Sequence, residues 1–245
     1  TYQGQGPGEI TIIGHVGIDE TNRRFFVSDH GKLKIFAYDL DSVLTTPEYQ
    51  PSVKIDMKKK LFPDDYLYLN DTLCIAKIIE PIGNNDYKPS VARWNMATGE
   101  INPMPYEYPD LKKVRFIYAA SAEHQLYVQC YTQYDLMTIC DFNGNLKCNI
   151  YGPKWVNEKT QTQHYSLGVE FCGDKILALY SGGDHRTDAY YPTKFLVFDL
   201  NGNYLKTLET GYMITDFCYD KENNRLIINL NDEIQFAYLD LEGII

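Results

Sequence analysis

The sequence predicts an all-β fold, a β-propeller of four-stranded blades, and three observations support this prediction. A pattern of strands and turns recurs five times at intervals of 49 to 56 residues, which is typical of propeller blades. In each repeat an Asp or Asn is the next-to-last residue of the third strand, and a tight turn follows. No segment has a convincing 3.6-residue apolar period, so little helix is expected.

Each repeat opens with a strand that should line a central channel. These first strands begin near Ile10, Tyr66, Arg115, Tyr165 and Ile214. The five readable blades cover residues 10–57, 66–105, 115–150, 165–209 and 214–245 of one domain that spans 1–245. The fifth repeat stops where its fourth strand should begin. Either residues 1–3 close that blade or a sixth blade belongs to the parent protein, because an open ring leaves unpaired sheet edges.

The middle strands are apolar on both faces, as expected for blades that stack face against face. The second strands are residues 25–27, 73–76, 126–128, 176–179 and 226–228. The third strands end at Asp39-Leu40, Asn95-Met96, Asp141-Phe142, Asp199-Leu200 and Asp240-Leu241. A turn should follow at Asp41-Ser42 in the first repeat and at Asn-Gly pairs in the third and fourth, because Asn-Gly supplies the positive φ of tight hairpin turns.

Composition and charge exclude several classes of protein. The chain has a formal net charge of −10, whereas a nucleic-acid binder needs a basic stripe, so we expect no nucleic-acid partner. No run of 18 apolar residues occurs, and we expect no transmembrane segment. The six cysteines show neither a CxxC motif nor zinc spacing, so we predict no structural metal and no cofactor.

The segment Gly4-Gln5-Gly6-Pro7-Gly8-Glu9 resembles the G-x-GPGE signature of TolB-like six-bladed propellers, which are abundant as secreted or lipid-anchored proteins of Bacteroidetes. The Asp-x-Asn-Gly turns at Asp141 and Asp199 are also similar to that family. The resemblance implies six blades in the parent protein and a location in the periplasm or at the cell surface. It carries over no functional residue, since the family has no agreed activity, and it implies a structural role for Glu9.

Three long connections should lie on one face of the blades. Insertions at 80–90 and 181–193 and the linker 151–164 share this face, because the loops after second and fourth strands open on the same side. They carry aromatic and polar side chains, among them Tyr87, His185 and Tyr190. Tyr combines a rigid apolar ring with a polar tip, which suits a protein or carbohydrate ligand. Strand propensity explains most of the 21 tyrosines in the chain.

A mixed polar cluster is expected at the channel mouth, where the first strands begin. The candidate ligand-binding residues are Glu9, Asp65, Tyr66, Arg115, His164, Tyr165 and Asp216, together with His185 and Tyr190 from the loops. Carboxylates, a guanidinium and an imidazole could hold an ion or a polar ligand. Polar linings also occur because a propeller channel holds water, and this alternative stays open.

Two functions of different classes fit these features. The first is a non-catalytic binding or scaffold propeller at the cell envelope, whose unknown ligand binds the long loops and the channel mouth. The alternative is a metal-assisted hydrolase or lyase that acts at the channel mouth. Neither a Gly-x-Ser-x-Gly nor a Walker pattern occurs, so the pattern favours binding, although fold alone cannot choose.

Three cysteines, Cys130, Cys140 and Cys148, fall on successive strands of the third blade. A loop centred on Asp135 would pair Cys130 with Cys140, and one centred on Gly144 would pair Cys140 with Cys148, so the thiols would form a row on one face. Cβ atoms of directly opposed residues lie about 4.5–5.5 Å apart, which is slightly wide for a disulfide. We therefore predict three free, buried thiols.

Overall fold

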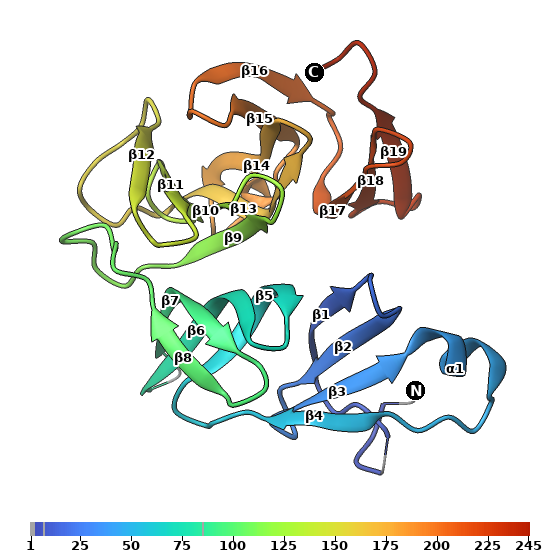
Figure 1. Cartoon of the computed structure of the whole chain (residues 1–245). Helices are drawn as coiled ribbons and strands as arrows, with labels where there is room; N and C mark the ends of the chain where they lie inside the picture. Colours follow the sequence, from blue (N-terminus) through green and yellow to red (C-terminus); the bar gives the residue numbers. More distant parts are fainter. Residues whose placement is uncertain (1–2, 7, 85) are drawn as a thin grey trace. The chain divides into compact units, whose positions relative to one another are not determined.

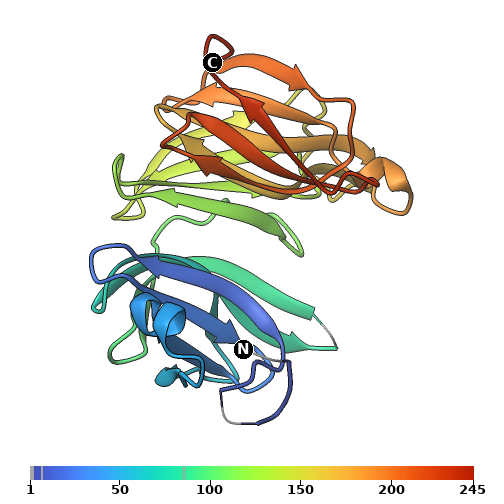
Figure 2. The ribbon, with the colours of Figure 1, turned by 90° about the vertical axis from the view of Figure 1, so that its right-hand side faces the viewer.

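The computed structural model describes residues 3–6, 8–84 and 86–245 (Figure 1). The chain divides into two compact units, Thr1–Glu107 and Tyr108–Ile245. Within each unit, antiparallel strands that follow one another in the chain lie side by side in a sheet, as Figures 1 and 2 show. This arrangement confirms the all-β fold class and the four-stranded repeat.

Unit 1 contains two four-stranded sheets among its described residues. The first has the order β1 (Ile13–Asp19), β2 (Arg24–Asp29), β3 (Lys34–Asp39) and β4 (Ser52–Asp56). The second has the order β5 (Phe62–Asn70), β6 (Leu73–Gly83), β7 (Asp86–Asn95) and β8 (Glu100–Pro103). Buried side chains of both sheets, including Phe26, Tyr66 and Trp94, form one hydrophobic core.

Unit 2 contains two four-stranded sheets and one three-stranded sheet among its described residues. The first comprises β9 (Phe116–Ser121), β10 (Leu126–Tyr131), β11 (Leu136–Asp141) and β12 (Leu146–Tyr151). The second comprises β13 (Thr162–Cys172), β14 (Lys175–Asp184), β15 (Lys194–Asp199) and β16 (Tyr204–Glu209). The third comprises β17 (Ile214–Asp220), β18 (Arg225–Leu230) and β19 (Phe236–Asp240). Strand β13 contacts both β9 and β17, so neighbouring sheets share apolar cores.

The strands expected from the sequence are present in order. The five predicted first strands are β1, β5, β9, β13 and β17, and the five predicted second strands are β2, β6, β10, β14 and β18. Most second strands are buried on both faces, as Tyr127 and Val128 on β10 and Ile176 and Leu177 on β14 illustrate with exposed fractions of 0%. Strand β18 is different, since buried and half-buried residues alternate along it. Burial on both faces is what removes the period-2 alternation from these segments.

The expected turn at Asp41-Ser42 is wrong, because a short helix, α1 (Leu40–Thr45), stands in its place. Asp39 has extended backbone angles, and its side chain accepts a 2.7 Å hydrogen bond from the backbone amide of Ser42. This is the geometry of a helix N-cap, in which a carboxylate satisfies an amide that has no partner inside the helix. The Asp that closes the third strand therefore begins a helix in this blade.

The insertion at 80–90 is also not a loop. It extends the hairpin of β6 and β7, with Glu80 opposite Lys88 and Gly83 opposite Asp86. Gly83 has a φ of +89°, a conformation that glycine adopts without steric cost. The insertion thus satisfies its own backbone through ladder hydrogen bonds.

Irregular pairing marks four of the five first strands in the described residues. The register shifts between Ile13 and Val16 in β1, between Pro63 and Asp65 in β5, twice between Gln163 and Val169 in β13, and between Ile214 and Asp216 in β17. A bulge redirects the side chains next to it and often occurs beside functional sites. These bulges turn polar residues such as His15 and His164 away from the regular alternation.

The predicted row of cysteines is wrong. Cys130 lies opposite Met137, and Cys140 lies opposite Tyr127 and Leu146, whereas Cys148 lies opposite Ile139. The β10–β11 hairpin is centred between Gln133 and Tyr134 and not on Asp135, and a bulge shifts the β11–β12 ladder. The three thiols therefore do not lie opposite one another. All six cysteines are free. Cys130 and Cys140 are buried as predicted, but Cys148 is only half-buried, and its Sγ lies 3.4 Å from the carbonyl of Asn201.

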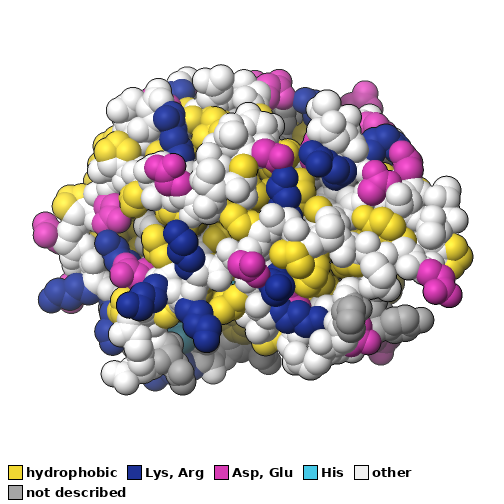
Figure 3. All heavy atoms as spheres, turned by 60° about the horizontal axis from the view of Figure 1, so that its bottom comes forward, with side chains coloured by type: hydrophobic (Ala, Val, Ile, Leu, Met, Phe, Trp, Pro, Cys, Tyr) yellow, Lys and Arg dark blue, Asp and Glu magenta, His cyan; other side chains and the backbone are white. Residues whose placement is uncertain are grey.

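Both signs of charge share the face drawn in Figure 3, where acidic and basic side chains are interspersed with hydrophobic ones. Within the described part of the chain, no helix is long and apolar enough to cross a membrane.

Candidate functional site

In unit 1 the bulges of β1 and β5 bring an imidazole and a carboxylate together. His15 Nδ1 lies 3.0 Å from Asp65 Oδ1, and the side chains are 25% and 39% exposed. The ring of Tyr66 lies beneath, with its centroid 4.5 Å from that of His15. Tyr66 fits close to β1 because position 17 is a glycine, whose missing Cβ would come within 2.4 Å of the Tyr66 ring. His15 and Asp65 therefore form an accessible acid–base pair supported by a buried phenol.

Burial raises the pKa of Tyr66, so this phenol stays neutral at physiological pH. Among the described residues, the buried hydroxyls of Tyr66 and Ser28 have no partner in hydrogen-bonding geometry. Lys77 pairs with the neighbouring Asp64 at 2.8 Å. The carboxylate of Asp65 therefore pairs with His15, while Lys77 on strand β6 neutralises the charge of Asp64.

In unit 2 the long connections form a surface that we call the loop face, made of residues 108–115, 132–135, 151–164 and 181–193. Two of its members, Asp135 and His164, have side chains that are only 1% exposed. Asp135 Oδ2 accepts from the backbone amide of Lys154 at 2.9 Å, and its carbonyl accepts from the amide of Gly152 at 2.8 Å. A carboxyl group from one connection thereby fixes the start of the next.

The other carboxyl oxygen of Asp135 meets the side chains of blade four. Tyr180 Oη donates to Asp135 Oδ1 at 3.3 Å, and His164 Nδ1 lies 3.3 Å from Tyr180 Oη and 3.7 Å from Asp135 Oδ1. On its other side, His164 Nε2 lies 3.4 Å from Thr160 Oγ1. These contacts join two connections, 132–135 and 151–164, to strand β14 around one buried centre.

Burial lowers the pKa of His164, although the neighbouring Asp135 acts to raise it and Lys154 acts to lower it. Burial also raises the pKa of Tyr180, with Asp135 acting in the same direction. Both side chains therefore remain neutral near neutral pH, as expected for groups kept from water. Because His164 is only 1% exposed, it supports the loop face and does not offer a ring nitrogen to a ligand.

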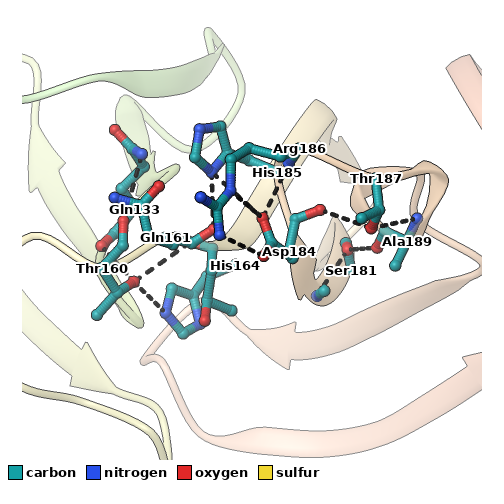
Figure 4. A network of polar contacts seen from close by, with 12 residues as sticks. Gln133, Thr160, Gln161, His164, Ser181, Asp184, His185, Arg186, Thr187 and Ala189 are labelled. Atoms are coloured by element: carbon teal, nitrogen blue, oxygen red, sulfur yellow. Dashed lines mark hydrogen bonds and ion pairs between the residues drawn. The ribbon is translucent and has the colours of Figure 1, made fainter.

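Nearer the surface, hydrogen bonds join the insertion 181–193 to the linker (Figure 4). His185 donates its backbone amide to the carbonyl of Gln161 at 3.1 Å, and its Nδ1 lies 2.9 Å from the same oxygen. Arg186 pairs with Asp184 through Nε and Nη2 at 3.2 and 3.0 Å, which lowers the pKa of Asp184 to about 2. Ser181 Oγ donates to the carbonyl of Ala189 at 2.5 Å and closes the insertion on itself.

An aromatic cluster of Tyr108, Tyr134, Tyr151 and Trp155 lies in the same loops. The centroid of Trp155 is 5.1 Å from that of Tyr151, 5.8 Å from Tyr108 and 6.3 Å from Tyr134. Tyr134 is buried, whereas Tyr151 is 51% exposed and Trp155 and Tyr108 are half-buried. The hydroxyls of Tyr108 and Tyr151 lie 3.3 Å apart. The loop face therefore presents aromatic rings that neighbouring rings hold in place.

The predicted site residues divide between the two units. Asp65 and Tyr66 lie together in unit 1, while His164, His185 and Tyr190 lie in or beside the loop face of unit 2. The backbone carbonyl of Tyr190 lies 3.4 Å from Ser166 Oγ, and its ring lies 4.2 Å from that of Tyr191.

Four predicted residues play other parts. Tyr165 is 2% exposed and belongs to the core between blades three and four, so it offers no surface to a ligand. The backbone carbonyl of Arg115 accepts a hydrogen bond from the amide of Thr132 at 2.9 Å. The carbonyl of Thr132 in turn accepts one from the backbone amide of His164 at 2.8 Å. Asp216 is exposed on β17, although partial desolvation by neighbouring residues raises the pKa of its carboxyl group.

Glu9 closes its own turn by accepting from the amide of Gly6 at 2.6 Å, and Lys32 Nζ donates to the carbonyl of Glu9 at 2.7 Å. This geometry agrees with the structural role that the GPGE resemblance implies. Pro7 of that motif lies outside the described residues.

The insertion 181–193 and the linker 151–164 lie together as predicted, since Gln161 contacts His185 directly. That the insertion 80–90 lies on the same face stays a prediction. Sequence reasoning missed His15 and Asp135. Asp135 follows Tyr134 in the short connection between two apolar strands. An acidic residue at such a position was the one feature of the sequence that could have pointed to a buried carboxylate. Among residues 3–6, 8–84 and 86–245, no three His, Cys, Asp or Glu side chains converge as metal ligands. The absence of a structural metal stays a prediction.

A family model described as DUF5128, a six-bladed β-propeller, matches residues 1–72. A member of the DUF4221 family from Bacteroides vulgatus superposes with a TM-score of 0.62 at 12% identity, covering 97% of this chain and 80% of that one. The fold is a β-propeller.

Other solved propellers are similar at the same level. The extracellular domain of BT4673, a proposed one-component system from B. thetaiotaomicron, gives a TM-score of 0.60 at 11% identity and covers 94% of this chain. This chain spans only 28% of that protein's chain. A chain of the nidogen–laminin complex gives 0.60 at 11% identity, with 94% and 76% of the two chains covered. No curated protein matches the sequence. Identities this low establish the fold alone.

Proposed function

We propose that this chain is a non-catalytic binding propeller of the cell envelope and that the loop face of unit 2 holds its ligand. The observation that carries the proposal is that buried Asp135 ties its own connection to the linker 151–164 and to strand β14. These contacts leave Tyr151 and Trp155 partly exposed on a fixed frame. Rigid aromatic anchors with polar neighbours are the usual centre of a binding surface, since little conformational entropy is lost on binding.

The envelope location rests on two lines of support. The Gly4 to Glu9 segment resembles the signature of TolB-like proteins, which are secreted or lipid-anchored. The similar solved structures include an extracellular domain of a Bacteroides protein. We propose the periplasm or the cell surface, with a protein or carbohydrate as the ligand.

Trp155→Ala tests this proposal in the whole chain. Candidate proteins and glycans are screened against the wild-type protein by biolayer interferometry, and each binder is measured again with the variant. We expect at least roughly tenfold weaker binding, since a hot-spot aromatic is worth about 2 kcal/mol or more. Tyr204→Ala is the matched control, because Tyr204 is 56% exposed and makes one ring contact, to Phe198. Binders whose affinity is unchanged by Trp155→Ala would show that the ligand binds outside the loop face.

A second candidate function, a metal-assisted hydrolase or lyase, is favoured by one observation, the accessible His15–Asp65 pair in unit 1. An imidazole oriented by a carboxylate can act as a general base. Turnover of ester, glycoside or uronide substrates with added divalent ions that disappears in Asp65→Asn would support this function.

A further inference from the structure

The loop face differs in charge from the rest of the chain. Residues 108–115, 132–135, 151–164 and 181–193 hold six Lys or Arg against five Asp or Glu, and one of these acids, Asp135, is buried. The remaining sequence holds 17 Lys or Arg against 28 Asp or Glu. An acidic protein thus carries a locally basic surface beside its exposed aromatic cluster. Local charge of one sign attracts ligands of the opposite sign even when the net charge of the protein does not.

The lysines of this surface are available to a ligand. Lys112, Lys113, Lys154 and Lys159 are exposed, and within the described residues none of them pairs with a carboxylate. Most other lysines pair with an acid: Lys34, Lys54, Lys77, Lys88, Lys175, Lys194 and Lys221. Lys58, Lys59 and Lys60 of unit 1 form a second exposed group that has no carboxylate partner among the described residues. What marks the loop face is therefore the aromatic cluster that lies beside its lysines.

The same lysines border the aromatic cluster. The backbone of Lys112 is fixed by Tyr134, whose hydroxyl donates to the Lys112 carbonyl at 2.7 Å and accepts from its amide at 3.2 Å. Lys154 precedes Trp155, and its Nζ lies 3.5 Å from the carbonyl of Gly182. Because Tyr134 also contacts Trp155, the cations and the exposed rings share one rigid support.

From this juxtaposition we infer that the loop face binds an acidic carbohydrate, a chain of sugar rings that bear carboxylate or sulfate groups. The inference rests on the proposed function and names its ligand class. The C–H groups of a sugar ring carry a slight positive charge and can lie on the negative face of Trp155 or Tyr151. Its anionic groups then meet Lys112, Lys113 and Lys154 through charge-assisted hydrogen bonds. An acidic peptide would satisfy the lysines but offers no such ring face.

Binding of defined polymers tests the inference by isothermal titration calorimetry and affinity electrophoresis. The probes are polygalacturonate, its methyl-esterified form, dextran sulfate, dextran, poly-L-glutamate and single-stranded DNA. We expect binding to polygalacturonate, to dextran sulfate or to both, which separates carboxylate from sulfate recognition. Affinity should fall by about tenfold or more for the uncharged counterpart, for poly-L-glutamate and for DNA, because each lacks either the charge or the sugar face aligned with it.

The triple variant Lys112→Ala/Lys113→Ala/Lys154→Ala should weaken binding of the anionic polymer roughly tenfold, as expected when three exposed charge pairs are lost. Its control is Lys58→Ala/Lys59→Ala/Lys60→Ala, which removes three exposed lysines from unit 1 and should change nothing. Equal binding of poly-L-glutamate or DNA, equal binding of dextran, or equal effects of the two triple variants would overturn the inference. A different ligand that is lost in Trp155→Ala while every acidic sugar fails would overturn it and leave the proposed function standing.

Discussion

The connections after β6 and β14 show two ways of ordering a long insertion. In blade two, residues 80–90 continue the ladder between β6 and β7, so each strand satisfies the backbone of the other. In blade four, β14 extends to Asp184 by pairing with β13, and the remaining residues bond to the linker through Gln161 and to themselves through Ser181. The first insertion depends only on itself, whereas the second depends on its neighbours.

This difference explains why the loop face is the better candidate for binding. A self-contained hairpin presents two regular edges, but a loop pinned by neighbouring segments gathers side chains from several parts of the sequence. Buried Asp135, His164 and Tyr180 hold those segments in register. Sites of this kind keep ligand-binding side chains in position before the ligand arrives.

The largest expected effect comes from removing the anchor. Asp135→Ala leaves the amide of Lys154 and the hydroxyl of Tyr180 without their acceptor, which should lower the free energy of unfolding by about 2–4 kcal/mol. Glu80→Ala, in the exposed part of the hairpin, should change it by less than about 0.5 kcal/mol. Urea denaturation measures both. Similar losses of unfolding free energy in Asp135→Ala and Glu80→Ala would contradict the difference described between the two insertions.

Gly183 and Gly83, one in each insertion, differ in the space that is left for a Cβ atom. A Cβ at position 183 would lie 1.9 Å from the carbonyl oxygen of Ala189, so Gly183→Ala must displace the insertion and should cost about 1–3 kcal/mol. A Cβ at position 83 meets nothing within 4 Å, and Gly83→Ala should cost only about 1 kcal/mol through its positive φ. The midpoints of thermal unfolding should rank the variants in this order, and the reverse order would contradict the packing described for the insertion.

A smaller effect should appear with pH. Because burial lowers the pKa of His164 in the folded protein, the unfolded chain binds its proton more readily. The stabilisation from neutral His164 is therefore present above its unfolded pKa of about 6.5 and is lost as pH falls toward the lower folded pKa. Asp135, Tyr180 and Lys154 face this ring. His164→Gln should flatten the fall in urea midpoint between about pH 6.5 and pH 5, and an unchanged slope would show that other groups cause it.

Sequence reasoning found the strands because their signals are local. Asp199-Leu-Asn-Gly and its counterparts mark turns wherever they occur, and apolar triplets such as Leu126-Tyr127-Val128 mark buried strands. The His15–Asp65 pair could not be found this way, since it depends on bulges in two strands that belong to different repeats. The cysteine register failed for a related reason, because a change of one residue in a connection moves a side chain to the other face.

Hydrogen exchange followed by mass spectrometry tests most directly whether the loop face is one cooperative structure. Peptides covering 151–164 and 181–193 should be protected at neutral pH, and Thr160→Val should raise exchange in both together. Thr160 Oγ1 donates to the carbonyl of Gln133 and lies near His164 Nε2, so its loss should loosen the frame that both segments share, while 80–90 should exchange as in the wild type. Unprotected exchange in 181–193 of the wild-type protein, or a response confined to 151–164, would contradict the account.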